Sequence, residues 1–560
     1  MEKIWLKSYP PGVPAEIDPD AYRSLVELFE KSCQKYPDSP AFYSLGKTIT
    51  YRELDAYTRD FAAYLQTDLK LKKGDRFAIM LPNILQYPIA MFGALRAGLV
   101  IVNVNPLYTV DELKHQMNDS GADVLLVLTN FASVVQKALP QMQSLKHIIV
   151  TNVGDMLPAV KGFITNLVLK YVYKKIPDWD LPNPVYFKTA LRKGKKATFK
   201  SIDLIGEDIA FLQYTGGTTG VSKGAVLTHR NLIANIQQAS AWFDGLILGG
   251  NEIIITALPL YHIFSLTANC FFFTMIGGLN VLIANPRDMP ASIKEMKKFQ
   301  FTAITGVNTL FNGLMKDPDF AQLDFSKLRL SLGGGMAVQQ VVADRWQKIT
   351  GAPLLEAYGL TETSPCVTIN PANLKAYNGS IGLPVSSTDV CILDEDQKEV
   401  PIGEPGELAV KGPQVMSGYW EHPRETAKVF TKDGWLLTGD IASIDEQGYL
   451  RILERKKDMV LVSGFNVYPN EIEGVLAQIP GVKEVAVIGV PDENSGEAVK
   501  AFVVKEDPAL TAADVTSFAR NHLTGYKRPK HIEFVDELPK TNVGKILRRA
   551  LRAETGSPSH

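Results

Sequence analysis

The chain has 560 residues, too many for one ordinary hydrophobic core, so two or more domains are expected. With 46% hydrophobic and 21% charged residues, its composition is that of a soluble globular protein and excludes a disordered or fibrous chain. The formal net charge of −1 excludes a globally basic protein, and we expect no nucleic-acid partner.

The cysteines and the two ends of the sequence indicate a cellular compartment. The four cysteines stand far apart, so we predict neither a disulfide framework nor a zinc site, and a reducing environment is expected. The first residues lack the pattern of a signal peptide, and the last ones match no prenylation or peroxisomal signal. We therefore expect a cytoplasmic protein.

Helical and strand patterns alternate along the first two-thirds of the chain. Apolar residues recur at helical spacing in residues 22–36, 51–65 and 86–97. Short β-rich runs occupy residues 76–80, 99–104, 124–128 and 148–150. This alternation predicts an α/β fold in which helices cover parallel sheets.

An uncharged segment, residues 263–285, is long enough to raise the question of a transmembrane helix. Polar residues and a Gly-Gly pair at positions 277–278 interrupt it. We expect instead a buried helix up to about residue 275, a turn, and a strand over residues 280–284.

The pattern of expected strands and helices changes in the last third of the chain. Short strands with glycine and proline turns over residues 385–410 predict a small β-subdomain. Strand-like runs at 484–490 and 499–504 and a helical pattern at 512–523 predict a compact α+β domain. We accordingly expect a large N-terminal domain, residues 1–456, and a small mobile C-terminal lid, residues 457–560.

The most informative segment is residues 209–225, where an apolar run leads into glycines, threonines and a lysine. Glycines let the backbone approach a phosphate, while N–H groups and threonine hydroxyls donate hydrogen bonds to it. Lys223 adds a positive charge. A Walker loop would need glycine where Ser222 stands, so a standard P-loop ATPase is excluded.

A serine acyl-hydrolase is a second interpretation of the same segment. Residues 220–224 match the Gly-x-Ser-x-Gly nucleophile elbow, with Ser222 as the nucleophile. That elbow requires a strand directly before it and a helix after it. Here a glycine-threonine loop precedes the motif and the strand-like residues 225–228 follow, a context that favours phosphate binding.

Residues 214–224 resemble the loop of the AMP-forming acyl-adenylate (ANL) superfamily, which includes acyl-CoA synthetases and luciferases. In that pattern Ser222 occupies a variable position, which removes the reason for a catalytic serine. The resemblance implies that ATP is a substrate. Its implied contacts in this loop are Tyr214, Thr215, Gly216, Gly217, Thr218, Thr219, Gly220, Lys223 and Gly224.

Further motifs follow in the order of the superfamily. Residues 358–362 match its second core motif, which implies that Tyr358 stacks on adenine beside Gly359 and that Thr361 contacts the α-phosphate. Glu362, with Thr215, would hold Mg²⁺, which prefers carboxylate and phosphate oxygens. The remaining implied nucleotide contacts are Gly333, Gly334 and Gly335 at the adenine, Asp440 at the ribose, and Arg455 at the ribose or a phosphate.

The resemblance also assigns roles beyond the nucleotide. Lys457 matches the hinge between the domains, and Lys545 matches the catalytic lysine of adenylation. A mobile ammonium group can stabilise charge that builds on the carboxylate and the α-phosphate. Ser463, Gly464 and Phe465 would lie beside the pantetheine channel of CoA. We expect the arginines that follow, at positions 548, 549 and 552, to form the solvated face of a helix.

Residues 433–457 resemble the extended signature of fatty-acyl-CoA synthetases, although Leu437 stands where family members usually have histidine. The broader chain looks like the bacterial long-chain enzymes. This implies a ligase that activates long-chain fatty acids to acyl-CoA through acyl-AMP, with release of AMP and pyrophosphate, in fatty acid metabolism that feeds beta-oxidation. Medium-chain and aryl acids remain open as alternative substrates.

Two further expectations concern apolar surfaces. The resemblance places His262 at the acyl pocket, and the uncharged residues 263–275 could line a tunnel; core packing is the alternative. Residues 161–175 combine apolar side chains with four lysines, a pattern that can lie on an anionic membrane or form an ordinary surface helix. Peripheral contact with the cytoplasmic face of a membrane and a homodimer are therefore hypotheses.

Overall fold

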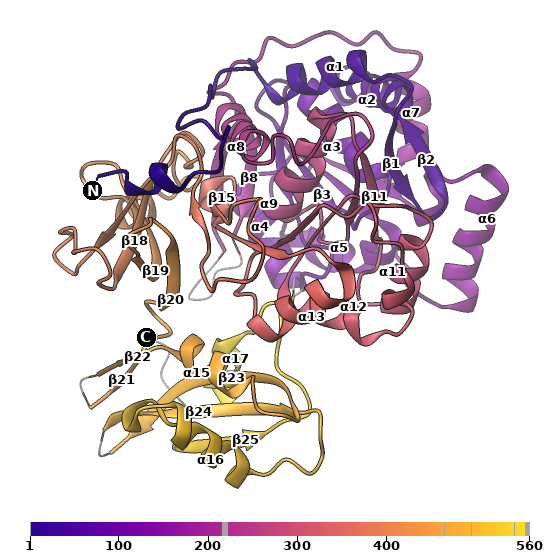
Figure 1. Ribbon diagram of the computed structural model, residues 1–560. Coiled ribbons are helices and arrows are strands. Elements are labelled where there is room, and N and C mark those ends of the chain that lie inside the picture. The colour runs from indigo at the N-terminus through magenta and orange to yellow at the C-terminus, as the bar shows by residue number, and fades with distance from the viewer. Residues whose placement is uncertain (1, 216–221, 464, 494, 542–543, 555–560) are drawn as a thin grey trace.

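The computed structural model describes residues 2–215, 222–463, 465–493, 495–541 and 544–554. Figure 1 shows a large N-terminal part, a four-stranded sheet beside it, and a smaller C-terminal part below. The chain passes into the C-terminal part after strand β20 (Leu450–Arg455). This arrangement confirms the predicted α/β fold with a β-subdomain and a small α+β unit.

One large sheet of the N-terminal part has seven strands in the order β7-β6-β5-β3-β4-β8-β9. All neighbours are parallel except β8 and β9, which form an antiparallel hairpin at one edge. The strands are β3 (Arg76–Met80), β4 (Val100–Asn103), β5 (Val124–Leu128), β6 (His147–Thr151), β7 (Val185–Tyr186), β8 (Ile209–Tyr214) and β9 (Gly224–Thr228). Every residue of β5 is buried, as expected of a parallel strand covered on both faces.

The second large sheet has nine strands in the order β16-β15-β14-β13-β12-β10-β11-β1-β2. Its central strands are parallel, and both ends are antiparallel. The strands are β1 (Pro40–Ser44), β2 (Lys47–Thr50), β10 (Ile253–Thr256), β11 (Leu279–Leu282), β12 (Ala303–Gly306), β13 (Leu330–Gly333), β14 (Leu354–Gly359), β15 (Cys366–Ile369) and β16 (Leu383–Pro384).

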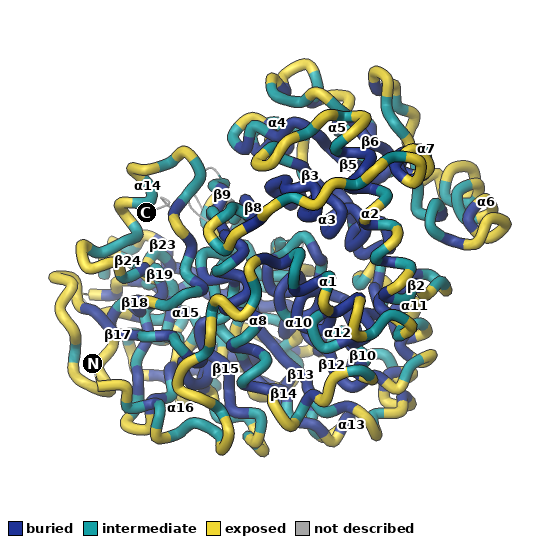
Figure 2. The backbone as a smooth tube through the Cα atoms, turned by 90° about the horizontal axis from the view of Figure 1, so that it is seen from above, coloured by how far each residue is buried: buried dark blue, intermediate teal, exposed yellow. Residues whose placement is uncertain are grey.

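Helices pack over both sheets, and α3 lies buried along its whole length between them (Figure 2). One hydrophobic cluster contains Phe42 of β1, Phe77 of β3 and Phe92 of α3, so the two sheets share a core. Capping boxes fix the starts of α2 at Thr50 and of α8 at Thr228. The helices are α1 (Leu25–Lys35), α2 (Tyr51–Thr67), α3 (Gln86–Arg96), α4 (Val110–Ser120), α5 (Ala132–Ala138), α6 (Ala159–Leu167), α7 (Phe187–Gly194), α8 (His229–Trp242), α11 (Met289–Met296), α12 (Asn308–Lys316), α13 (Gln340–Thr350) and α14 (Pro423–Val429).

The uncharged segment forms a buried helical stretch and a strand, as predicted. The helix is interrupted, however: α9 (Ile263–Ser265) continues through a π-helical turn (Leu266–Phe271) into α10 (Phe272–Met275) before β11 begins. Within the described ranges, no helix combines the length and the hydrophobicity that a membrane span requires.

The four-stranded antiparallel sheet consists of β17 (Asp389–Leu393), β18 (Gly406–Lys411), β19 (Leu436–Ile444) and β20. The C-terminal part has a five-stranded sheet with cores of its own. Its elements are β21 (Val460–Val462), β22 (Phe465–Val467), α15 (Pro469–Leu476), β23 (Val482–Asp492), β24 (Gly496–Lys505), α16 (Ala512–His522), β25 (His531–Phe534) and α17 (Arg548–Glu554).

Candidate active site

The predicted phosphate loop is the connection between β8 and β9. Tyr214 is the last residue of β8 and Gly224 the first of β9. The Thr215 N–H donates to the Lys223 carbonyl at 3.1 Å, which closes the loop at its base. Gly216, Gly217, Thr218, Thr219 and Gly220 lie outside the described residues.

The surroundings of Ser222 argue against a nucleophile elbow. Its hydroxyl donates to the Thr215 carbonyl, and His115 Nε2 contacts the Ser222 carbonyl oxygen at 2.7 Å rather than the hydroxyl. The residues that follow form strand β9 and not a helix. From Ser222 onward, where the chain is described again, it lacks the strand-to-helix turn that a serine hydrolase requires.

Lys223 contacts two residues that lie outside the sequence motifs. It forms an ion pair with Glu425 of α14, and its ammonium lies 5.3 Å from the ring centre of Tyr419. The Tyr419 hydroxyl donates to Glu362 Oε1 at 2.7 Å. Tyr419 thus connects the lysine of the phosphate loop to the carboxylate predicted to bind Mg²⁺.

Tyr358 and Arg455 both bind the carboxylate of Asp440, and all three residues are predicted to contact the nucleotide. The Tyr358 hydroxyl donates to Asp440 Oδ2 at 2.5 Å, and Arg455 Nε pairs with Asp440 Oδ1 at 2.9 Å. The Asp440 side chain is only 2% exposed. Its charge raises the pKa of Arg455, and burial together with that charge raises the pKa of Tyr358. The Tyr358 hydroxyl therefore stays protonated and donates its hydrogen bond to Asp440.

The glycines after β13 allow close approach to this region. A Cβ atom on Gly334 would lie 3.1 Å from the Ala357 carbonyl oxygen and from the ring of Phe264. Gly335 has a φ of +76°, in the left-handed region, and a Cβ atom there would lie 3.5 Å from Cε of Lys545. At Gly333 and Gly359 a Cβ would collide with neighbouring atoms at 2.6 Å and 1.9 Å.

Lys545 comes from the C-terminal part and lies close to this group of residues. Burial lowers its pKa to about 8, and the charge of Arg455 acts in the same direction, whereas Asp440 and Glu362 oppose the shift. Burial, with a smaller contribution from Lys545, lowers the pKa of His262 to about 3. The neutral His262 accepts the Phe264 N–H at Nδ1, 3.3 Å away, at the start of α9.

The predicted hinge and CoA-side residues follow β20. Burial, then Arg455, lowers the pKa of Lys457 to about 8. Ser463 donates its N–H to the Ser495 carbonyl at 2.8 Å, and Phe465 stacks on Tyr526 with ring centres 4.7 Å apart. Both contacts join residues of the C-terminal part. Gly464 lies outside the described residues.

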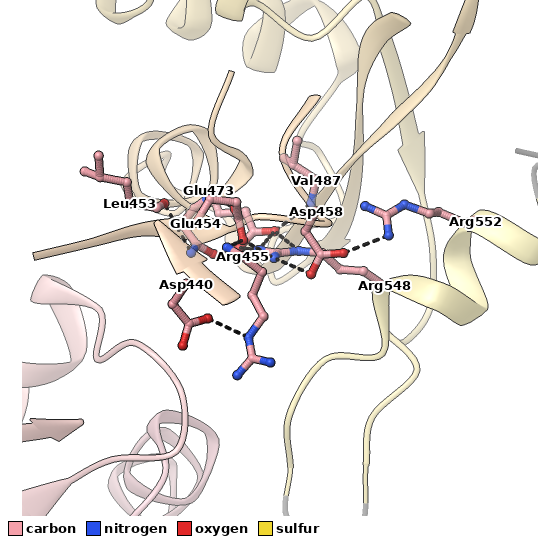
Figure 3. A network of polar contacts seen from close by, with 10 residues as sticks. Asp440, Leu453, Glu454, Arg455, Asp458, Glu473, Val487, Arg548 and Arg552 are labelled. Atoms are coloured by element: carbon pink, nitrogen blue, oxygen red, sulfur yellow. Dashed lines mark hydrogen bonds and ion pairs between the residues drawn. The ribbon is translucent and has the colours of Figure 1, made fainter. Parts of the chain in front are cut away.

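The expectation that the arginines of α17 form a solvated face is wrong for two of them. Arg548 pairs with Glu454 at 2.8 Å and with Glu473 at 2.9 Å, and Arg552 pairs with Asp458 at 2.7 Å (Figure 3). The two arginine side chains are 13% and 16% exposed. Buried carboxylates thus replace water around them.

The donor set around Glu362 fits a Mg²⁺ that is shared with phosphate oxygens. The described residues contain no cluster of three or more acidic, histidine or cysteine side chains able to hold a metal by themselves. A single carboxylate such as Glu362 suits Mg²⁺, which keeps several waters and is usually bound together with substrate phosphates.

Tyr358, Asp440 and Lys545 thus lie close to the glycines that follow β13, as expected of an adenylate-forming enzyme. Sequence comparison agrees: the family described as AMP-binding enzyme matches residues 29–420, and the AMP-binding enzyme C-terminal domain matches residues 471–545. The chain belongs to the AMP-binding enzyme family, as its motifs predicted.

Relatives and solved structures extend nearly the full length. A long-chain-fatty-acid–CoA ligase of Escherichia coli O6:H1 is 58% identical and covers 99% of this chain and 98% of its own. The anthranilate CoA ligase AuaEII in complex with anthranoyl-AMP has a TM-score of 0.85 at 25% identity, covering 96% and 99% of the two chains. ATP-bound MatB from Rhodopseudomonas palustris has a TM-score of 0.78 at 29% identity, covering 94% and 98%.

Proposed function

We propose that this chain is an AMP-forming ligase that converts long-chain fatty acids to their CoA thioesters. ATP activates the carboxylate as acyl-AMP with release of pyrophosphate, and CoA then displaces AMP. Its full-length similarity to long-chain-fatty-acid–CoA ligases supports this reaction. The structural observation that carries it is the position of Lys545 beside Gly335 and the Tyr358–Asp440–Arg455 group.

Adenylation follows from the charges around this cleft. A carboxylate oxygen attacks the α-phosphorus, and the bond to pyrophosphate breaks. The Lys545 ammonium stabilises the negative charge that develops between the two reacting groups, since it is held in a partly desolvated cleft. Thr361, in the turn after β14, is proposed to contact the same phosphate.

The nucleotide contacts are proposed to divide among three elements. The β8–β9 loop, with Lys223 at its base, takes the phosphates, and Gly333 to Gly335 with Tyr358 take the adenine. Asp440 accepts hydrogen bonds from the ribose hydroxyls beside Arg455. Glu362 and Thr215 would hold Mg²⁺, which when bound neutralises charge on the leaving phosphates.

The thioester step is proposed to use a second arrangement of the two parts. The CoA thiol attacks the acyl carbonyl carbon, and AMP leaves as the carbon–oxygen bond breaks. Residues 1–456 would form the adenylation domain and residues 457–560 a lid that rotates about Lys457, which withdraws Lys545 and opens a path for CoA. Hinge closure of this kind lets one cleft serve two half-reactions.

The acyl chain is proposed to enter beside His262. Because the imidazole is neutral at physiological pH, it offers no charge to the fatty acid. The Phe264 ring lies next to Gly334, one of the glycines proposed to contact the adenine. The aromatic run that follows, Phe271 to Phe273, is buried core, in keeping with the core-packing alternative.

A peripheral membrane contact is proposed for α6 and the π-helical turn after it (Val168–Val172). This segment projects from the body of the protein (Figure 1) and leaves large apolar side chains exposed, among them Phe163 at 65% and Val172 at 68%. Exposed apolar residues beside lysines suit an anionic bilayer, where the fatty acid also partitions. Lys161, however, donates to the Leu45 carbonyl and anchors the segment. A second copy of the chain is the alternative occupant, and sedimentation would show it as a homodimer.

The substrate proposal is tested by measuring CoA-thioester formation with ATP across acids from acetate to oleate and with aryl acids. The best kcat/KM is expected for long chains. A preference for aryl or medium-chain acids would keep the adenylating mechanism and reject the long-chain assignment. Product formed without ATP would reject both.

A further inference from the structure

A cluster of buried charges surrounds the point where the chain passes into the C-terminal part (Figure 3). Two guanidinium groups, from Arg548 and Arg552, meet three carboxylates, from Glu454, Glu473 and Asp458. The Glu454 side chain is completely buried, and the other two carboxylates are 12% exposed. Such groups are strongly destabilised when a partner is removed, because a buried charge then stays uncompensated.

The ion pairs of this cluster differ in what they join. Arg548 with Glu473, and Arg552 with Asp458, connect residues that all follow the proposed hinge at Lys457. Arg548 with Glu454 joins α17 to the last strand before the hinge, β20. A rotation about Lys457 would leave the first two pairs intact and separate the third.

The position of Arg548 makes this third pair relevant to the reaction. Arg548 opens α17, and Lys545 lies three residues earlier on the same short connection. The Lys545 N–H and carbonyl are tied to Thr541 at 3.0 Å and 2.7 Å, so the connection is held by hydrogen bonds. Fixing Arg548 against β20 therefore also fixes where Lys545 enters the cleft.

We propose that Glu454 and Arg548 form a latch across the hinge, which positions Lys545 for adenylation and must open before the CoA step. This inference rests on the proposed two-step function. Both residues act through Lys545 and touch no substrate, so they are positioning residues. Glu454 has further support in place: its Oε2 accepts the Asn470 N–H at 2.8 Å, a second contact that crosses the hinge.

The other ion pairs of Arg548 lower the cost of opening the latch. When Glu454 separates from Arg548, Arg548 keeps the carboxylates of Glu473 and Asp458 as partners. No isolated guanidinium is left buried in the open arrangement. A pair that held both charges without alternatives would resist opening far more strongly.

The first test compares the two half-reactions in E454Q, which keeps the shape of the side chain and removes its charge. ATP–pyrophosphate exchange should fall about tenfold, the loss expected for one charged hydrogen bond. Thioester formation from preformed acyl-AMP and CoA should be unchanged or faster. R548K keeps the positive charge but loses the two-pronged geometry of the guanidinium group. It should likewise lower pyrophosphate exchange relative to thioester formation.

The matched control is E473Q, the same chemical change on another partner of Arg548 that does not cross the hinge. It should not lower the ratio of adenylation to thioesterification. If E454Q and R548K reduce both half-reactions equally, or change neither, the latch is contradicted. A fall in the ratio in E473Q as large as in E454Q would also contradict it.

A distance measurement separates this inference from the proposed function. Spin labels on L248C and A513C lie on exposed residues of the two parts, and the native cysteines are buried or half-buried. E454Q should broaden the distance distribution relative to the unsubstituted chain, and E473Q should not. Identical distributions in E454Q and the unsubstituted chain would overturn the latch. Absence of acyl-AMP formation in the unsubstituted chain would instead overturn the function.

Discussion

The Cε atom of Lys545 lies 3.5 Å from the point where a Cβ atom on Gly335 would stand, although the two residues belong to opposite ends of the fold. Gly335 follows β13 in the large N-terminal sheet, and Lys545 comes from the C-terminal part. A glycine at this point leaves room for the lysine. Lys545 thereby also comes near enough to Arg455 and Asp440 for their charges to act on its pKa, which is the position that the proposed adenylation step needs.

Gly335→Leu should reduce adenylation at least tenfold, because a side chain there would occupy the place of Lys545. The matched control is Gly351→Leu: both glycines have a φ of +76°, but nothing lies within 4 Å of a Cβ on Gly351. Both substitutions carry a backbone strain of roughly 1–2 kcal/mol. Equal loss of pyrophosphate exchange in the two variants would mean that strain, and not displacement of Lys545, is responsible.

Asp440→Asn should lower kcat/KM for ATP about 10- to 100-fold, since it removes the carboxylate that pairs with Arg455 and weakens the acceptor for Tyr358. Tyr358→Phe keeps the ring and removes only the hydroxyl, so its loss should stay within about tenfold. Steady-state kinetics with varied ATP give both values. A Tyr358→Phe loss as large as that of Asp440→Asn would contradict the central role of the carboxylate.

The rate of adenylation should fall as pH rises through about 8. Burial lowers the pKa of Lys545 to about 8, and the ammonium form, which stabilises the developing charge, predominates below that value. An arginine at position 545 stays charged above about pH 8. The residual pyrophosphate exchange of Lys545→Arg should therefore no longer fall as the pH rises. Lys457 also has a lowered pKa of about 8, and Lys457→Arg serves as the control. If the fall with pH disappears in Lys457→Arg and persists in Lys545→Arg, the titrating group is Lys457 and the prediction for Lys545 is wrong.

Binding to anionic vesicles should weaken when the lysines after α6 are reversed in charge. Flotation with vesicles that contain an anionic phospholipid should show several-fold less bound K170E/K174E/K175E than unsubstituted protein, and less still after added salt. Phe163→Asp should have a comparable effect without changing a lysine. Unchanged binding in both variants would contradict a membrane role for this surface.

Much of the fold followed from local patterns. Residues 76–80 and 124–128 form β3 and β5 with the predicted bounds, because uninterrupted apolar runs flanked by helical periodicity have few other ways to be buried. The helix predicted up to residue 275 was correct in position, but its π-helical turn at Leu266–Phe271 has no signal in the apolar spacing.

The site was predictable where motifs carried it and not where pairing is long-range. Tyr358, Asp440, Arg455 and Lys545 each lie in a recognisable motif, and the structure brings them together. The link from Lys223 through Tyr419 to Glu362 was missed, because a tyrosine after glycine has no distinctive pattern. Arg548 was misjudged since helical periodicity assigns charges to solvent, whereas its partner Glu454 lies 94 residues away in the chain.

The role of Lys545 in adenylation is tested most directly by ATP–pyrophosphate exchange driven by a long-chain fatty acid in Lys545→Ala, with Lys540→Ala as control. Lys540 lies five residues earlier and pairs with Glu484 within the C-terminal part. We expect a loss of about 10²- to 10³-fold in Lys545→Ala, as for removal of one charge-stabilising group, and little change in Lys540→Ala. Full exchange activity in Lys545→Ala would contradict the central claim that this lysine stabilises the adenylation step.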